Sequence, residues 1–458
     1  MKFRRFFSVF FSLLLVLQLC CPAFAAEGDV GDWEVLAKAA LLVDPETEEV
    51  LYARNIHEKL YPASLTKVMT ALLVLEAIEE EKLAMDTVLT ASETAISNLP
   101  DDGSNAGIVV GEELTVEQLL HCILVVSANE ACDILAEAVS GTVDAFVARM
   151  NERAAEIGCK NTHFMNANGL HSVEHYTTAW DLYLITQQAC THDVFLRICN
   201  TKYYEVTPTN KNPSSRKYYT TNYLISTARD ANYLYKGANG VKTGSTSDAG
   251  YCLIATAQRS GRSLLSVVLG AERKTLEDGR RETRSFSETV KLLDYGFDGF
   301  QRAVILDEME LIDEVEVTLS QEQNSVKVHP AESIECLIPS SITPSDIERT
   351  VTFFADSVEA PVTKGQVLGQ VTLRYNGIEY GTVDLLADED VREAPLLVFQ
   401  KDMLEFVNST PFKLGLMGAG ALLVLILIVS LSVRKRRRRR NDSGRRGGYR
   451  GRSGGRRR

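Results

Sequence analysis

Three short polar strings follow one another along the 458 residues of this chain: S-L-T-K at 64–67, S-A-N at 127–129 and K-T-G at 242–244. A serine hydroxyl becomes a good nucleophile only when a base takes its proton, and a neutral lysine can be that base. A polar relay and a cationic strand complete a set suited to acyl transfer on a substrate that carries a carboxylate. Each string alone is common, so the prediction depends on the ordered trio.

The first string is expected at the start of a helix. Pro62 precedes it, and proline suits the first helical turn, where its missing N–H is not needed. Ser64 would then lie in the positive end of the helix field, and Lys67, three residues later, would share its face. Burial or a neighbouring cation must lower the pKa of Lys67 before it can act as a base. An isolated S-x-x-K string is more often an exposed pair on a helix.

The other two strings have a chemical and an ordinary structural interpretation. Lys242 and Thr243 on an edge strand can bind a terminal carboxylate, and Gly244 lets a peptide lie against the strand backbone. Lys242 can also help to keep the first lysine neutral. Ser127 can pass a proton to the leaving amine, while Asn129 orients the substrate amide or the first lysine. Taken alone, K-T-G would be a strand-end turn and S-A-N a helix cap.

Other hydrolytic chemistries lack their motifs in this sequence. Residues 35–433 contain no G-x-S-x-G elbow for a Ser-His-Asp hydrolase, no H-E-x-x-H zinc motif and no CxxC pair. His171 and His175 have the spacing of a metal pair, but Gly169 and polar neighbours predict a solvated loop. The cysteines are irregularly spaced and are mostly expected in the core, although a bridge between Cys190 and Cys199 stays open.

Both ends of the chain have membrane signals. A basic start, an apolar run and a small-x-small site predict a cleavable export signal over residues 1–25. Residues 414–433 are uncharged and long enough to cross the hydrocarbon core. The arginine-rich residues 434–458 follow at once, and basic residues beside a span stay in the cytoplasm. We therefore expect a single-pass protein of the cell membrane, with its bulk on the extracytoplasmic side.

The charge distribution argues against a nucleic-acid partner. Residues 26–433 contain 32 basic and 60 acidic residues, and this composition does not suggest a basic face for nucleic acid. The basic tail lies beside the span, which favours attraction to anionic lipid.

Composition and periodicity predict two domains between the membrane signals. Residues 35–298 mix strands and helices, and residues 301–394 are expected to form an all-β domain. A linker at 395–413 follows, for which a short interfacial helix is one interpretation. In the first domain we expect strands at 39–44, 50–53, 251–257 and 263–269, and helices at 64–80, 115–139 and 142–157. In the second we expect strands at 306–310, 314–319, 325–328, 332–338, 350–354, 367–374 and 378–386, with a tight hairpin at Asn376-Gly377. Thr115 and Gln118 resemble a capping box.

With these strings in view, the chain resembles the low-molecular-mass penicillin-binding proteins, the D-alanyl-D-alanine carboxypeptidases. The likeness extends to PASLTKVMT from Pro62, SANEACDILAE from Ser127, NANGL from Asn166 and NGVKTGSTSDAGYCLIA from Asn239. It spans about residues 35–298. The implied fold is an α/β (α+β) domain of the β-lactamase and transpeptidase type, with a central antiparallel sheet and a helical subdomain. The all-β domain and the anchor also resemble the family.

The resemblance implies a role for each residue of the first two strings. Ser64 would be the acylated nucleophile and Lys67 its base, with Ser127 and Asn129 as the second active-site element. The oxyanion hole would consist of the backbone N–H groups of Ser64 and Ser245.

Recognition of the substrate carboxylate would fall to the third string, at Lys242, Thr243, Gly244 and Ser245. An arginine beyond this strand assists in some members, and spacing does not choose between Arg280 and Arg281. Many members have a basic residue shortly before the K-T-G hairpin, where this chain has Thr221.

The implied reaction removes the terminal D-alanine from peptidoglycan stem pentapeptides through an acyl-enzyme that water resolves. Penicillin would acylate Ser64 and stay, and no metal or organic cofactor is needed. One alternative is a membrane-anchored serine β-lactamase, which would normally have S-D-N and an E-x-x-L-N string that this chain lacks. The other is a non-enzymatic β-lactam or cell-wall-binding protein, although only a basic tail follows the span.

Overall fold

The computed structural model describes residues 34–97, 99, 103–228 and 230–444. The predicted export signal at 1–25 and the last part of the basic tail lie outside the described residues. The chain forms two compact units. The first runs to Leu306 and includes Ile334–Glu348 and Leu373–Gly381, and the second comprises Asp307–Ser333, Arg349–Thr372 and the residues from Thr382 onward.

A five-stranded antiparallel sheet is the centre of the first unit, with strand order β2-β1-β9-β8-β7. Its strands are β1 (Ala39–Asp44), β2 (Glu49–Arg54), β7 (Ala238–Thr246), β8 (Gly250–Arg259) and β9 (Arg262–Ala271). The strands predicted at 39–44 and 50–53, and those at 251–257 and 263–269, are confirmed as the neighbouring pairs β1–β2 and β8–β9. The K-T-G string lies inside β7, at the edge of the sheet, so its outer side is open to a partner of the same extended form.

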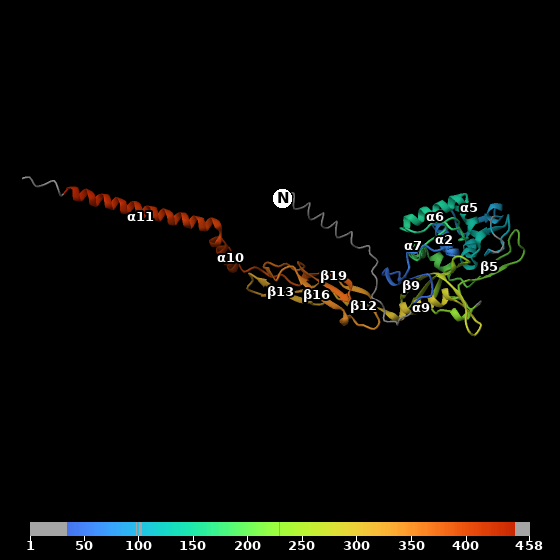
Figure 1. Ribbon diagram of the computed structural model, residues 1–458. Coiled ribbons are helices and arrows are strands. Elements are labelled where there is room, and N and C mark those ends of the chain that lie inside the picture. Colours follow the sequence, from blue (N-terminus) through green and yellow to red (C-terminus); the bar gives the residue numbers. More distant parts are fainter. Residues whose placement is uncertain (1–33, 98, 100–102, 229, 445–458) are drawn as a thin grey trace, which may run out of the picture. The chain divides into compact units, whose positions relative to one another are not determined.

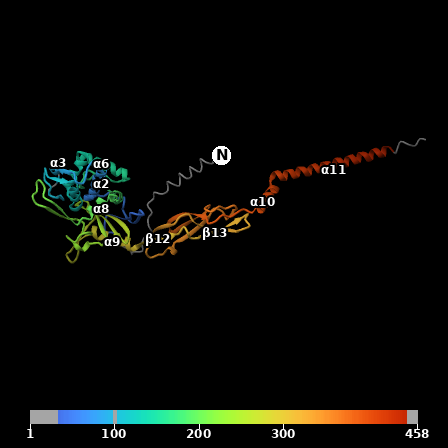
Figure 2. The same ribbon diagram turned by 180° about the vertical axis from the view of Figure 1, so that it is seen from behind.

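Helices cover both faces of this sheet (Figures 1 and 2). Side chains alternate along each strand, so Leu41 and Val43 of β1 join one core and Leu42 joins the other. On the first face lies α2 (Lys67–Glu79), and on the opposite face lies α9 (Arg284–Gly299). Ten of the thirteen residues of α2 are buried, which makes it the central helix of the larger core.

The remaining elements between β1 and α9 form a helical part and three small hairpins. The helices are η2 (Ala63–Thr66), α3 (Glu93–Ser97), α4 (Val116–His121), η3 (Cys122–Val126), α5 (Asn129–Ser140), α6 (Val143–Ile157), α7 (Ala179–Cys190), α8 (Asp193–Cys199) and η4 (Ala231–Tyr233). The hairpins pair β3 (Val88–Thr90) with β4 (Glu113–Thr115), β5 (Tyr203–Val206) with β6 (Arg216–Tyr219), and β10 (Arg273–Thr275) with β11 (Arg281–Thr283).

The single helix predicted over 115–139 is wrong. The capping box of Thr115 and Gln118 is confirmed, but α4 passes into the π-helix η3 and the helix then ends at Ser127. Ser127 has a φ of 68°, in the left-handed region, where a helix cannot continue. A new helix, α5, begins at Asn129. The apolar spacing of both halves faces one core, so periodicity alone did not reveal the break.

The predicted all-β region is confirmed as a class, with differences in detail. A six-stranded sheet has the order β16-β18-β19-β14-β13-β17, and β12 pairs with β15. The strands of this region are β12 (Phe300–Leu306), β13 (Asp313–Thr318), β14 (Ser325–Pro330), β15 (Ile334–Pro339), β16 (Glu348–Phe353), β17 (Ser357–Glu359), β18 (Val367–Tyr375) and β19 (Ile378–Ala387), with the short helix η5 (Pro344–Asp346). The strand expected at 306–310 is wrong because β12 ends at Leu306, and β17 was not predicted. Asn376 and Gly377 both have positive φ, as the predicted tight hairpin requires.

Two helices complete the described chain, α10 (Pro395–Asn408) and α11 (Thr410–Gly444). The predicted linker is therefore largely helical. Residues Thr410–Arg437 are long and apolar enough to cross a membrane, and this stretch includes the predicted span at 414–433.

Candidate active site

The first string forms a tight turn that leads into a helix, as expected. Ser64 lies in η2 and Lys67 opens α2, so the lysine Nζ lies 3.0 Å from Ser64 Oγ. Ala63, directly before the serine, has a φ of 48°, which is unusual for a residue with a side chain. Such strain is tolerated where the surrounding structure holds the residue in place, and it often accompanies functional sites.

Lys67 is fully buried, and its amine has three polar neighbours. Besides Ser64 Oγ, they are Asn129 Oδ1 at 2.8 Å and the main-chain oxygen of Asn168 at 2.6 Å. Burial lowers the pKa of Lys67, because the charged form loses its hydration, while the acidic groups of Cys132 and Asp133 act in the opposite direction. The pKa of Lys67 is therefore shifted in the direction that a lysine base requires.

The second string spans the break between η3 and α5, with Ser127 at the end of η3 and Asn129 at the start of α5. Ser127 is buried, and within the described residues its Oγ has no hydrogen-bond partner. A buried hydroxyl without a protein partner can form a hydrogen bond with a substrate or a water molecule. Asn129 lies at the start of α5 with its Oδ1 directed at Lys67.

The third string lies along β7, close to the turn that holds Ser64. Lys242 is almost fully buried, and its Nζ donates to the main-chain oxygen of Thr243 at 2.8 Å. Burial, followed by the nearby charge of Lys67, lowers the pKa of Lys242 to about 7. Thr221, which stands where a basic residue was expected, lies with its hydroxyl 2.6 Å from that of Thr243.

Gly244 allows β7 to approach the turn that contains Ser64 closely. A Cβ at this position would lie 3.0 Å from both Pro62 O and Ser64 N, and 3.2 Å from Leu65 N. All three atoms belong to the backbone, so a side chain here would push the strand away from Ser64. Ser245 follows on the exposed part of the strand.

The loop after α6 contributes a residue to which we assigned no role from the sequence. Asn168 supplies the carbonyl that accepts from Lys67, and the loop packs tightly at Gly169, where a Cβ would lie 1.9 Å from Ala63 O. The signal was the NANGL string: Asn166 Oδ1 accepts from the N–H of Gly169, a side-chain turn that holds this loop in shape.

The expectation that His171 and His175 form a solvated pair is wrong for His175. This side chain is buried, and burial lowers its pKa to about 4. Its Nδ1 accepts from the N–H of Met165 at 3.3 Å, so the proton lies on Nε2, which donates to Thr66 Oγ1 at 2.9 Å. Thr66 in turn donates to Ala63 O, so this neutral histidine stabilises the turn that contains Ser64.

The described residues include neither a cluster of metal ligands nor a disulfide bond. No group of three or more His, Cys, Asp or Glu is close enough to hold a metal ion among the described residues. All seven cysteines in the described ranges are free thiols, so the bridge between Cys190 and Cys199 is not formed. Arg280 pairs with Asp278, and both Arg280 and Arg281 are exposed.

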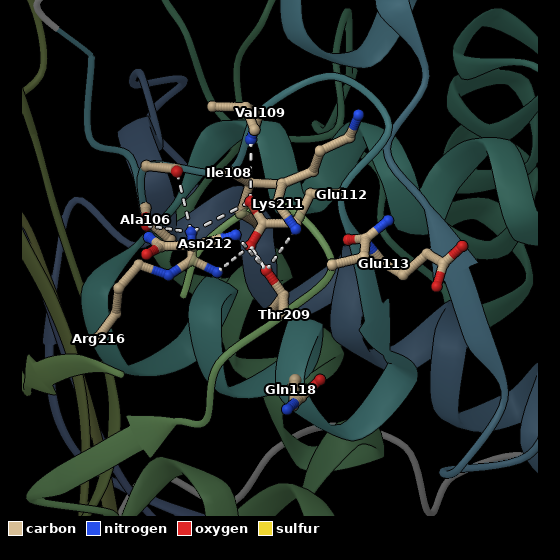
Figure 3. Close-up of polar contacts among 12 residues, drawn as sticks. Ala106, Ile108, Val109, Glu112, Glu113, Gln118, Thr209, Lys211, Asn212 and Arg216 are labelled. Carbon is tan, nitrogen blue, oxygen red and sulfur yellow. Dashed lines mark hydrogen bonds and ion pairs between the residues drawn. The ribbon is translucent and has the colours of Figure 1, made fainter. Parts of the chain in front are cut away.

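Two buried carboxylates, Glu130 and Glu112, form hydrogen bonds with segments near the second string, and Figure 3 shows the contacts of Glu112. Glu130, next to Asn129, accepts from Ala106 N at 2.6 Å. Glu112 is completely buried and accepts from Arg216 at 2.5 and 3.3 Å, and Arg216 also donates to the carbonyl of Gly107. These contacts tie the segment before α4 to the start of α5 and to the β5–β6 hairpin.

Comparisons with known proteins agree with this architecture. The family model for D-alanyl-D-alanine carboxypeptidase matches residues 24–273, and that for the C-terminal domain of penicillin-binding protein 5 matches residues 310–393. The D-alanyl-D-alanine carboxypeptidase DacF of Bacillus subtilis is 30% identical over 400 residues, which cover 87% of this chain and 97% of the relative. DacC of Escherichia coli is 30% identical over 376 residues, which cover 81% of this chain and 88% of the relative.

Solved structures give the same result. Penicillin-binding protein 5 from Haemophilus influenzae matches with a TM-score of 0.57 and 30% identity, over 80% of this chain and 100% of that chain. DacD from Francisella tularensis matches with a TM-score of 0.62 and 25% identity, over 81% and 98%. The chain therefore belongs to the D-alanyl-D-alanine carboxypeptidase family of serine peptidases. Its fold combines an α/β catalytic domain, an all-β C-terminal domain and one apolar C-terminal helix.

Proposed function

We propose that this chain removes the terminal D-alanine from peptidoglycan stem pentapeptides through an acyl-enzyme on Ser64. The observation that carries the proposal is the set of contacts around Lys67. A neutral amine has two N–H groups and one lone pair. Asn168 O and Asn129 Oδ1 are acceptors and take both N–H groups, so the lone pair is left for the proton of Ser64 Oγ.

In the first step, Ser64 Oγ bonds to the carbonyl carbon of the penultimate D-alanine while its proton passes to Lys67 Nζ. The tetrahedral oxyanion accepts from the backbone N–H groups of Ser64 and Ser245. The C–N bond to the terminal D-alanine then breaks, and the leaving nitrogen takes the proton from Lys67 through Ser127 Oγ. The unpartnered state of this buried hydroxyl supports its role as the relay.

Lys242 and Thr243 bind the carboxylate of the terminal D-alanine, and Gly244 lets the peptide lie along the open edge of β7. The pKa of Lys242, about 7 without substrate, supports this role, because an adjacent carboxylate favours the charged amine. Deacylation reverses the chemistry: water attacks the ester carbonyl, its proton passes to Lys67, and Ser64 leaves with a proton restored to its Oγ.

Penicillin acylates the same serine, and its ring-opened product stays attached instead of leaving. The ring nitrogen remains tethered to the acyl group, so it stays where water must approach. No cofactor enters either reaction.

We further propose that the chain is exported, cleaved after residue 25 and anchored by one span at 414–433. The catalytic domain (35–298) and the all-β domain (301–394) then lie outside the cell membrane, joined to the span by residues 395–413. The tail at 434–458 lies in the cytoplasm against anionic lipid. The apolar helix and the basic residues directly after it support this orientation.

The test compares the full-length chain in detergent with its Ser64→Ala variant, using a pentapeptide and a fluorescent penicillin in separate assays. We expect D-alanine release and a stable penicillin adduct for the native chain, and neither for the variant. Labelling that persists in the variant would remove Ser64 from its role. Rapid penicillin turnover would instead favour a β-lactamase, and an adduct without D-alanine release a binding protein.

A further inference from the structure

One buried acid close to the site has no part in the mechanism above. Asp133 lies on α5, one helical turn after Asn129, and its side chain is only 6% exposed. Carboxylates are seldom buried to this extent unless a partner holds them. Since it faces the interior next to the catalytic lysine, its position requires a reason.

Asn168 connects this acid to the lysine through two different groups. Its main-chain oxygen accepts from Lys67 Nζ at 2.6 Å, and its side-chain Nδ2 donates to Asp133 Oδ1 at 3.4 Å. The orientation of the amide is determined, because Asn168 Oδ1 accepts from the N–H of Leu170 at 3.0 Å. Asp133 therefore accepts a hydrogen bond from the side chain of Asn168, the residue whose main-chain oxygen contacts Lys67.

The charges around Asp133 couple it to the lysine as well. Lys67 faces it from α2, Lys242 belongs to the same buried group on β7, and Glu130, Cys132 and Glu137 lie on its own helix. Burial raises the pKa of Asp133 to about 7, against the opposing effect of the Lys67 charge. Groups coupled in this way share their protons.

We propose that Asp133 is a positioning residue that orients Asn168 for Lys67 and sets the pH above which Lys67 acts as a base. The proposal rests on the function of Lys67 proposed above. When the pair holds one proton, it can exist as Lys67⁺ with Asp133⁻ or as neutral Lys67 with protonated Asp133. Lys67 can accept a proton only in the second form. The Asp133 carboxylate favours the first form, so it lowers the fraction of enzyme that can react at low pH.

The test measures the rate of acylation by a fluorescent penicillin from pH 5 to 10, with the full-length chain in detergent. Asp133→Asn keeps an oxygen for Asn168 but removes the charge that raises the pKa of Lys67. We expect the acid limb of the profile to move to lower pH by about one unit, with a plateau rate close to the native one. A residue with a merely structural role would change the rate without moving the limb.

Two further variants complete the design. Asp133→Ala removes both charge and acceptor, so its limb should move equally while its plateau falls about tenfold. The acid limb of the Asp133→Ala profile still tests the proposal if Asp133→Asn fails to fold. Glu137→Gln, two turns from Asn129 on the same helix, changes the net charge equally and should shift the limb much less.

The outcomes separate this inference from the proposed function. Native acylation with an unmoved limb in both Asp133 variants would overturn the inference and leave the role of Ser64 intact. A limb that moves equally in the Glu137 variant would also overturn it, since net charge would then be the cause. A native chain that penicillin does not acylate would overturn the proposed function and this inference together.

Discussion

The contact between Lys67 and Asn129 allows a sharp test of the lysine as the base. Asn129 Oδ1 lies 2.8 Å from Lys67 Nζ, and Asn129→Asp replaces the amide with a carboxylate of the same shape. The variant thus places a negative charge directly on the amine without creating a cavity. The charged form of Lys67 becomes more favourable, so its pKa must rise.

The distance sets the size of the effect. Two opposite charges 2.8 Å apart attract by about 6 kcal/mol at an effective dielectric constant of ~20. Part of this is offset by the loss of hydration of the new carboxylate, so we expect a rise of about two pKa units. Below the native pKa of Lys67 the neutral fraction then falls about 100-fold, and at high pH the difference disappears.

The assay is the rate of acylation by a fluorescent penicillin across pH, measured on the full-length chain in detergent. We expect the acid limb to move upward in the variant, in the direction opposite to that of Asp133→Asn. Asn200→Asp, at the exposed end of α8, is the matched control and should not move the limb, because solvent screens its charge. A uniform loss of rate at every pH would refute lysine as the base and leave Asn129 a substrate contact only.

Two further variants test the packing of the site. In Gly244→Ala the new Cβ must displace β7 from the backbone of Pro62 and Ser64 by a few tenths of an ångström. We therefore expect the rate of acylation to fall at least tenfold with the protein still folded. A native rate would show that the close approach of β7 to Ser64 does not matter. In Arg216→Met the fully buried Glu112 loses its cation, which should destabilise the protein by about 3–5 kcal/mol and lower the Tm by at least about 6 °C. A Tm within 2 °C of the native value would contradict this account of the ion pair, and Arg197→Met, which removes an exposed pair with Glu117, is its control.

Local sequence was sufficient wherever a feature depends on residues close together in the chain. The first turn of α2, the hairpin of β1 and β2, the cap at Thr115 and the turn at Asn376 all follow from neighbours within a few positions. The apolar helix near the C-terminus follows from composition alone. The three strings likewise predicted which residue types the chemistry needs.

The break at Ser127 marks the limit of that reasoning. Its left-handed backbone lies between η3 and α5, and apolar periodicity continues across it unchanged. His175 shows the same limit, since a polar loop predicted solvent where the fold provides Thr66 and Met165 as partners.

The sequence by itself therefore determined the chemical groups and the short segments that carry them. Only the tertiary structure decided their burial, the direction of their pKa shifts and their partners: the buried amine of Lys67, the lowered pKa of Lys242, and the link from Asp133 through Asn168. The physical reason is that hydration and charge depend on what surrounds a group in space. The surroundings of Lys67 come from residues 62 to 101 positions away, which no local pattern can bring together.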